Sequence, residues 1–105
     1  MNPNIDYLRD KANRLSLSPG VYLMKDKTGK IIYVGKAKAL KNRVTSYFRH
    51  DSNHNAKTLK LIDNIADFDF IVCPSELDAL VLECSLIKLH KPKYNILLKD
   101  DKGYN

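Results

Sequence analysis

The residue most informative about chemistry is Glu83, because it falls among apolar residues. Residues 75–90 carry apolar side chains at helical spacing. At about 100° per residue, Ile87 and Ala79 lie within about 40° of Glu83, so Glu83 falls in the middle of the apolar face of a helix. A carboxylate in that position must bind a metal, pair with a Lys or Arg, or be protonated, since an isolated buried charge is strongly destabilising.

Two tyrosines lie in short segments rich in Val, Ile and Tyr. Tyr22 follows Gly20 by two residues and Tyr33 precedes Gly35 by two, so in a strand each tyrosine shares a face with a glycine. Glycine lets a backbone or a ligand approach closely, and the tyrosine offers a hydroxyl group beside it. The alternative is that both tyrosines are half-buried packing residues with the hydroxyl group in water.

A third signal lies after the second of these segments. Lys36, Arg43 and Tyr47 are separated by seven and four residues, which places them on one stripe if a helix begins near Lys36. This stripe runs beside an apolar one formed by Leu40, Val44 and Phe48. A cation at the border of the core can bind a phosphate with less competition from water. A snorkelling Arg that covers apolar surface is the alternative.

The basic charge is concentrated in one segment. The chain has 18 Lys and Arg and 12 Asp and Glu, a formal net charge of +6 with a sequence pI of about 9.3. Residues 25–49 hold eight of the basic residues and one acid, Asp26, a net +7, which leaves ten basic and eleven acidic residues elsewhere, a net −1. This segment indicates either a polyanionic partner or a solubilising face.

Cysteine and histidine usage favours neither a disulfide framework nor a zinc site. Cys73 and Cys84 have no CxxC spacing and no third partner, and Cys84 is expected to be a small buried side chain. His50 and His54 have helical spacing but no further obvious ligand. Neither a signal peptide nor a membrane span is present in the sequence, so a cytoplasmic location is expected.

Periodicity predicts the elements that position these residues. Helices are expected at 4–15, 37–49, 57–66 and 75–90, strands at 20–25, 30–36 and 69–73, and a last extended piece at 96–98. The fold class is therefore α/β: a small domain with a mostly antiparallel sheet of about three strands, an N-terminal hairpin plus one later strand, flanked by helices. We expect a single domain over residues 1–105, with an N-terminal helix (1–17), a catalytic core (18–98) and the start of a linker (99–105).

Two short motifs resemble a known signature. Gly20-Val21-Tyr22 and, after ten residues, Tyr33-Val34-Gly35 are similar to the paired motifs of the GIY-YIG nuclease family, with Val in place of Ile. The runs YVGKAKALKNRVTSYF and ALVLECSLIKLHKPKYN resemble the N-terminal endonuclease domains of the bacterial UvrC excinuclease subunits, and the resemblance extends from about residue 18 to residue 102. Further residues stand at the spacing of that family: Lys36, Arg43, Tyr47, Glu83 and Asn95.

The resemblance implies an endodeoxyribonuclease that hydrolyses a phosphodiester 3′ to a lesion in nucleotide excision repair. It implies one divalent ion, Mg²⁺ or Mn²⁺, bound by Glu83, which suits an ion that keeps much of its water. Arg43 would stabilise charge on the phosphoryl oxygens. Tyr22 or Tyr33 would act as the general base, with Lys36 or the metal lowering its pKa, and we favour Tyr33.

Supporting roles follow from the same resemblance. Tyr47 is expected to orient the phosphate or a water, and Asn95 to steady the site by hydrogen bonding. Damaged double-stranded DNA is the implied substrate, and UvrB is the implied partner of a full-length subunit, with UvrA acting upstream. The isolated domain is expected to be a monomer away from any membrane, excised from a longer subunit, although a natural short relative is the alternative. DNA contacts are expected from five residues: Lys36, Lys38, Lys41, Arg43 and Arg49.

Three other functions are compatible with the sequence. The first is a non-catalytic nucleic-acid-binding module, for which salt-sensitive binding without metal-dependent cleavage is expected. The second is a stand-alone GIY-YIG nuclease of another pathway. The third is a protein-interaction domain whose charge is incidental.

Overall fold

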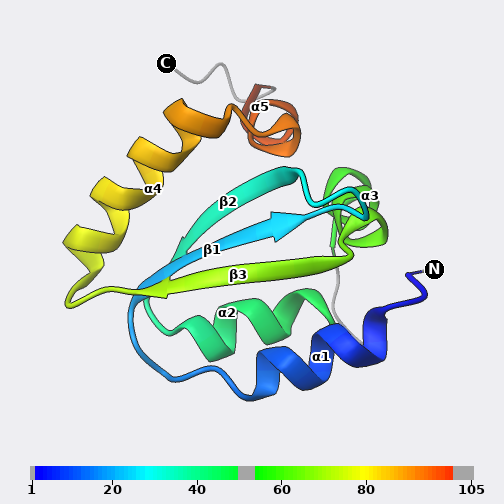
Figure 1. Cartoon of the computed structure of the whole chain (residues 1–105), viewed down its shortest axis with the longest axis horizontal. Coiled ribbons are helices and arrows are strands. Elements are labelled where there is room, and N and C mark those ends of the chain that lie inside the picture. Colours follow the sequence, from blue (N-terminus) through cyan, green and yellow to red (C-terminus); the bar gives the residue numbers. More distant parts are fainter. Residues whose placement is uncertain (1, 50–53, 101–105) are drawn as a thin grey trace.

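The computed structural model describes residues 2–49 and 54–100, with side chains up to residue 96. Its elements follow the chain in the order α1 (Ile5–Asn13), β1 (Gly20–Lys25), β2 (Ile31–Ala37), α2 (Leu40–Tyr47), α3 (Ala56–Asn64), β3 (Asp67–Val72), α4 (Glu76–His90) and α5 (Lys93–Asp100). The sheet has three antiparallel strands in the order β2-β1-β3. Helix α4 lies on one face of the sheet, and α1 and α2 lie on the other (Figure 1). The α/β class, the hairpin and the later strand expected from the sequence are confirmed.

The β1–β2 hairpin has the turn that the sequence predicts. The Asp26 carboxylate accepts hydrogen bonds from the backbone N–H of Thr28 at 2.9 Å and of Lys30 at 3.1 Å. Gly29 has φ +86°, a left-handed conformation in which residues with a side chain are strained. Strand β1 is thereby folded back on β2, and Tyr22 lies opposite Gly35 in the ladder.

The two faces of the sheet carry two separate apolar clusters, because side chains alternate along a strand. On the α1 and α2 side, Met24, Phe48 and Phe68 are buried in the larger cluster. On the α4 side, Val21 and Val34 pack with Ala79 of α4 in the smaller one. Strand β2 therefore has helices on both faces and forms one edge of the sheet.

Helix α2 begins later than the sequence suggested. Lys36 pairs with Val21 in the β1–β2 ladder, so it belongs to strand β2, and the prediction that Lys36 shares a helical stripe with Arg43 and Tyr47 is wrong. The helix begins at Leu40, whose N–H is hydrogen-bonded to the Ser18 carbonyl at 2.9 Å. This backbone contact with the segment before β1 cannot be read from periodicity.

The extended piece expected at 96–98 is also wrong, because α5 covers these residues. Lys91 ends α4 in the left-handed conformation with φ 45°, and Pro92 follows it. A proline shortly after a helix is normally taken as the signal that ends it. Proline is equally suited to the beginning of a helix, where its missing N–H is not needed, and Pro92 stands directly before α5.

Helix α4 faces the sheet through a different arc from the one predicted. Leu82, Leu86 and Ile87 pack against the smaller cluster beside the buried Ala79, whereas Cys84 is exposed and Leu80 is 41% exposed. The expected burial of Cys84 is wrong, and Glu83 lies about 40° from the middle of the inward arc. Apolar residues occur nearly all around this helix, so periodicity could not fix its orientation.

No helix in the described parts of the chain has the length and apolar character needed to cross a membrane.

Candidate active site

Tyr22 is the most buried member of the site, at 1% exposure in the middle of β1. Its ring crosses the neighbouring strand at Gly35. A Cβ atom at residue 35 would overlap the Tyr22 Cζ and hydroxyl oxygen, so the glycine is required for this packing. The sequence placed Tyr22 beside Gly20 and Tyr33 beside Gly35 within each strand, whereas the structure packs Tyr22 across the ladder on Gly35, which carries the Tyr22 hydroxyl over β2 and toward α2.

Helix α2 supplies the partners of that hydroxyl. The hydroxyl oxygens of Tyr22 and Tyr47 are hydrogen-bonded at 2.8 Å, and Arg43 Nε donates to the Tyr22 oxygen at 3.3 Å. The Arg43 guanidinium lies 5.2 Å from the centre of the Tyr47 ring, a cation–π distance. Because Arg43 and Tyr47 are four residues apart on α2, one helical turn presents both side chains to Tyr22.

Tyr33 completes the aromatic cluster from β2. Its ring centre lies 6.2 Å from that of Tyr22, and its side chain is half-buried. Burial raises the pKa of Tyr22 well above its usual value and also raises the pKa of Tyr33, while the Arg43 guanidinium lowers both pKa values in part. Both hydroxyl groups therefore keep their protons at neutral pH. The cation that opposes the shift is Arg43 rather than the Lys36 considered from the sequence.

The Glu83 carboxylate has no hydrogen bond or ion pair with any residue that the structure describes. It is half-buried on α4, beside Leu82 and Leu86, which pack against the sheet. Its charge contributes to the raised pKa of Tyr33, so the carboxylate acts on the Tyr33 hydroxyl group. The ion-pair alternative for Glu83 is thus not realised within the described parts of the chain.

The donor set around Glu83 fits a hydrated divalent cation. Among the residues that the structure describes, no three His, Cys, Asp or Glu converge on one point. One free carboxylate can nevertheless bind Mg²⁺, because that ion keeps several waters and commonly takes the rest of its ligands from a phosphate. A Zn²⁺ site, which needs three or four protein ligands, does not fit.

Asn95 is buried at 3% exposure and bonds to the backbone of β2. Its Oδ1 accepts from the N–H of Val34 at 2.8 Å, and its Nδ2 donates to the Val34 carbonyl at 2.8 Å. The side-chain amide thus occupies the place that another strand would take at this edge of the sheet. Since Val34 lies between Tyr33 and Gly35, Asn95 fixes the backbone that carries both of them.

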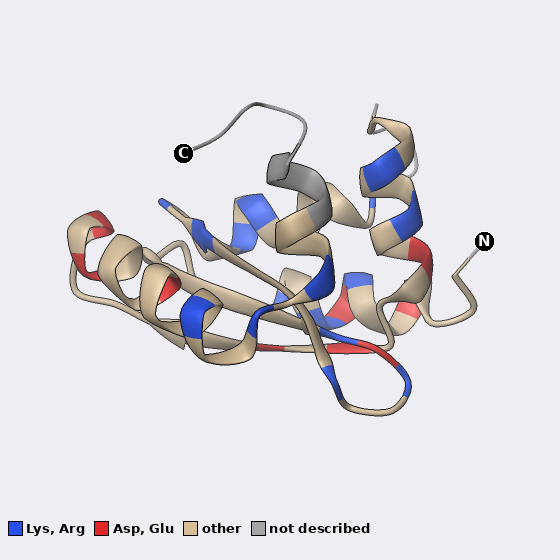
Figure 2. Ribbon diagram, turned by 90° about the horizontal axis from the view of Figure 1, so that it is seen from above, with Lys and Arg blue, Asp and Glu red and all other residues tan. Residues whose placement is uncertain are grey.

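The predicted basic residues divide into two groups. Lys36, Lys38 and Arg43 line a cavity of about 420 Å³ at the junction of β2 and α2, together with Ala37, Ala39, Asn42 and Ser46. Lys41 and Arg49 are not part of its lining. In Figure 2 the segment from the end of β2 through α2 shows basic positions and no acidic ones. Arg43 belongs both to this cavity and to the tyrosine cluster, so the two are contiguous.

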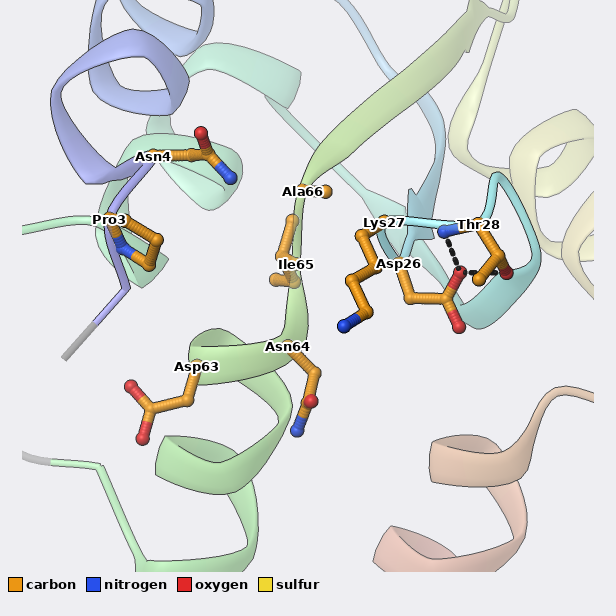
Figure 3. Close-up of a pocket in the computed structure, with 9 residues that line it drawn as sticks. All are labelled: Pro3, Asn4, Asp26, Lys27, Thr28, Asp63, Asn64, Ile65 and Ala66. Carbon is orange, nitrogen blue, oxygen red and sulfur yellow. Dashed lines mark hydrogen bonds between the residues drawn. The ribbon is translucent and has the colours of Figure 1, made fainter.

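A second cavity of about 340 Å³ lies between the hairpin turn, the N-terminal segment and the connection from α3 to β3. Figure 3 shows that the Asp63 side chain points away from Asp26, whose carboxylate is already bonded to Thr28. The lining includes no residue of the tyrosine cluster. Its shape and polarity therefore give no reason to place chemistry there.

One contributor to the site escaped the sequence analysis, which considered His54 only as a zinc ligand with His50. His50 lies outside the described residues. The His54 ring stacks on Tyr47, with the ring centres 6.0 Å apart and the planes at 14°. His54 stands in a polar segment without periodicity, so the sequence held no signal for this contact.

The close packing at Gly35 can be tested by adding one methyl group. We expect Gly35→Ala to lower the free energy of unfolding by about 1–3 kcal/mol, because the methyl group displaces the Tyr22 ring. Urea denaturation measures this change. Gly29→Ala is the control, since its Cβ meets open space and its positive φ alone predicts a loss of about 1 kcal/mol. A Gly35→Ala protein as stable as the unmodified chain would contradict the packing described for Tyr22.

Comparisons with known proteins agree on one family. The family described as "UvrC-like GIY-YIG domain" matches residues 18–96. The chain is 61% identical over 101 residues to the UvrABC system protein C of Desulfitobacterium hafniense (strain Y51), covering 96% of this chain and 16% of that protein. It is 60% identical over 86 residues to the same protein of Clostridium tetani (strain Massachusetts / E88), covering 82% of this chain and 14% of the relative. The chain thus spans about a sixth of the length of these relatives.

Solved structures give the same result at domain level. The chain is 37% identical to the GIY-YIG N-terminal endonuclease domain of UvrC from Thermotoga maritima, in a crystal structure bound to its catalytic divalent cation, magnesium. The TM-score is 0.74, and the match covers 90% of this chain and 98% of that domain.

Proposed function

Since the chain belongs to the family of UvrC-like GIY-YIG domains, the endonuclease domains of UvrC, we propose that it hydrolyses DNA phosphodiester bonds with the help of a divalent cation. The observation that carries the proposal is the Glu83 carboxylate, which has no ion pair among the described residues and acts electrostatically on Tyr33, a member of the cluster of three tyrosines and Arg43. A carboxylate, a guanidinium and hydroxyl groups around one space are the groups that phosphoryl transfer requires.

Glu83 is the residue that we assign to the cation. The related Thermotoga domain is bound to magnesium, which supports Mg²⁺, and Mn²⁺ is the alternative for a single ion at an oxygen ligand. When bound, the ion would polarise the phosphate and stabilise the leaving oxygen. Neutralising the Glu83 charge also removes a carboxylate field that raises the pKa of Tyr33, which moves that hydroxyl group toward proton release.

The tyrosines have different proposed tasks. The Tyr22 oxygen is buried and already bonded to Tyr47 and Arg43, so it is suited to holding these two side chains in place. Tyr33 is more exposed, so its hydroxyl group can release its own proton to solvent, and the resulting tyrosinate would accept a proton from the attacking water. A cation held by Glu83 would favour this release, because the Glu83 charge raises the pKa of Tyr33. Tyr47 is held in place by its hydrogen bond to Tyr22, and its side chain orients the phosphate. Arg43 stabilises charge on the phosphoryl oxygens, and Asn95 positions the β2 backbone.

The DNA strand is proposed to pass over the β2–α2 junction. Lys11 and Lys25 are ion-paired with aspartates, whereas Lys36 and Lys38 have no such partner in the described parts of the chain. Unpaired cations around one cavity repel each other, and a phosphate backbone relieves this repulsion. Arg43 lies at the inner end of this path. Lys41 and Arg49 are proposed to contact the DNA farther from the tyrosine cluster.

The relatives are named UvrABC system protein C, which supports a wider role for this domain in a UvrABC system. That role is incision 3′ to a lesion in damaged double-stranded DNA during nucleotide excision repair. UvrB is the proposed partner of a full-length subunit, with UvrA acting upstream, in the bacterial cytoplasm. For the isolated domain we propose a monomer.

The central test is metal-dependent nicking of duplex DNA by this chain. With Mg²⁺ or Mn²⁺ we expect nicked product, and we expect EDTA to abolish the nicking and excess metal to restore it, because without the ion the Glu83 carboxylate would face the phosphate with no cation between them. The same preparation should bind DNA without metal, since binding rests on the lysines. Salt-sensitive binding with no nicking under any metal condition would favour the non-catalytic binding module instead.

A further inference from the structure

A histidine outside the proposed catalytic set contacts one member of the tyrosine cluster, Tyr47. His54 precedes α3 and is half-buried. Its ring is nearly parallel to that of Tyr47, and its Nε2 lies 3.1 Å from the carbonyl oxygen of Ser46. These two contacts fix the imidazole in both position and rotation.

The second contact joins His54 to the last turn of a helix. Carbonyl groups in the last turn of a helix accept hydrogen bonds from groups outside the regular helical pattern. Helix α2 ends at Tyr47 and has no basic residue in its last turn. Because a carbonyl only accepts, Nε2 of His54 must carry the proton and donate it to Ser46. A histidine brought from a later segment thus caps the end of α2.

Tyr47 has three described side-chain contacts that bear on its orientation. The Arg43 guanidinium lies 5.2 Å from its ring centre, and the His54 ring is stacked against it at 6.0 Å. Its hydroxyl group bonds to that of Tyr22 at 2.8 Å. Rotation of the Tyr47 ring would move this hydroxyl group away from Tyr22 and would also disturb the cation–π contact of the ring with Arg43.

From these contacts we propose that His54 is a positioning residue, which holds Tyr47 in the orientation that the active site needs. The inference rests on the proposed function. His54 itself bonds to none of the tyrosine hydroxyl groups in the described parts of the chain, so it acts through Tyr47. A displacement of about 1 Å in a catalytic group can lower a rate by about 100-fold, which makes such a support kinetically important.

Three substitutions separate the ring contact from the cap. His54→Ala removes both, His54→Phe keeps the stacked ring, and His54→Gln keeps a hydrogen-bond donor. We expect His54→Ala to lower kcat for nicking by about 10- to 100-fold with KM for DNA within about twofold of the unmodified chain. His54→Phe should recover most of kcat, and His54→Gln should recover less. His90→Ala, at the exposed end of α4, is the control for loss of an imidazole and should leave kcat unchanged.

A second measurement is independent of cutting. In NMR spectra the ring protons of Tyr47 should shift in His54→Ala, because the ring current of His54 is lost, while the melting temperature reports on the fold. A normal kcat in His54→Ala, a loss confined to KM, or a His54→Phe protein as slow as His54→Ala would overturn the proposal. Were the unmodified chain unable to nick DNA, the proposed function would fail separately, and unchanged Tyr47 signals in His54→Ala would still refute the positioning role.

Discussion

Glu83→Gln is expected to lower kcat for metal-dependent nicking by about 1000-fold or more while leaving DNA affinity within about twofold, because it removes the proposed ligand of an essential cation. Glutamine has nearly the same shape as glutamate, so the packing of α4 beside Leu82 and Leu86 should persist. Only the negative charge is lost. Nicking rates with Mg²⁺ and with Mn²⁺, alongside fluorescence anisotropy of DNA binding, measure the two effects separately.

The same helix offers a matched control. Glu76→Gln makes the identical chemical change in the first turn of α4, where the side chain is exposed and lies outside the site. It should leave nicking unchanged. Full activity in Glu83→Gln would contradict the assignment of Glu83 as the ligand of the cation. Equal losses in both variants would show that the effect is one of overall charge.

The order of the elements could be predicted because each depends on local features of the chain. The hairpin rests on Asp26 and Gly29, and the start of α4 rests on the Ser75 cap, whose side chain accepts from the N–H of Asp78. The beginning of α2 and the existence of α5 depend on other contacts. Leu40 bonds to Ser18 outside the helix, and α5 begins after a proline that a sequence pattern reads as a stop.

In the site, too, some features depend on local sequence and others on contacts between distant parts of the chain. A helical wheel draws attention to Glu83 as a carboxylate among apolar residues, but it does not give the face that α4 turns to the sheet, because apolar residues occur nearly all around this helix. That Glu83 forms no ion pair with the described residues could not be predicted, since it depends on which residues lie opposite in space. The reason for Gly35 is likewise spatial: the Tyr22 ring occupies the volume where a Cβ atom would stand. His54 reaches Tyr47 only because the chain returns to the end of α2.

The second large effect is expected at Arg43. Arg43→Ala should lower kcat by about 100- to 1000-fold, because it removes a fixed donor and positive charge at the point where phosphoryl charge develops. The matched control is Lys41→Ala, which removes one positive charge from the same helix but does not line the cavity beside the site. Nicking rates at a fixed ionic strength distinguish a positioned cation from general attraction of DNA.

Arg43 is also expected to affect how the nicking rate depends on pH, because its guanidinium lowers the pKa of both Tyr22 and Tyr33. Removing it should raise both pKa values further, so a rate that depends on proton release from a tyrosine should rise with pH over a higher range in Arg43→Ala than in the unmodified chain. Arg43→Lys restores the charge but lacks the planar donor that meets the Tyr22 oxygen at 3.3 Å, so it should recover the pH profile better than kcat. Ultraviolet titration of tyrosinate measures the pKa shift without DNA. If the pH profile stayed the same in Arg43→Ala while kcat fell, the arginine would act on the phosphate alone, and the proton would be accepted by a group other than these two tyrosines.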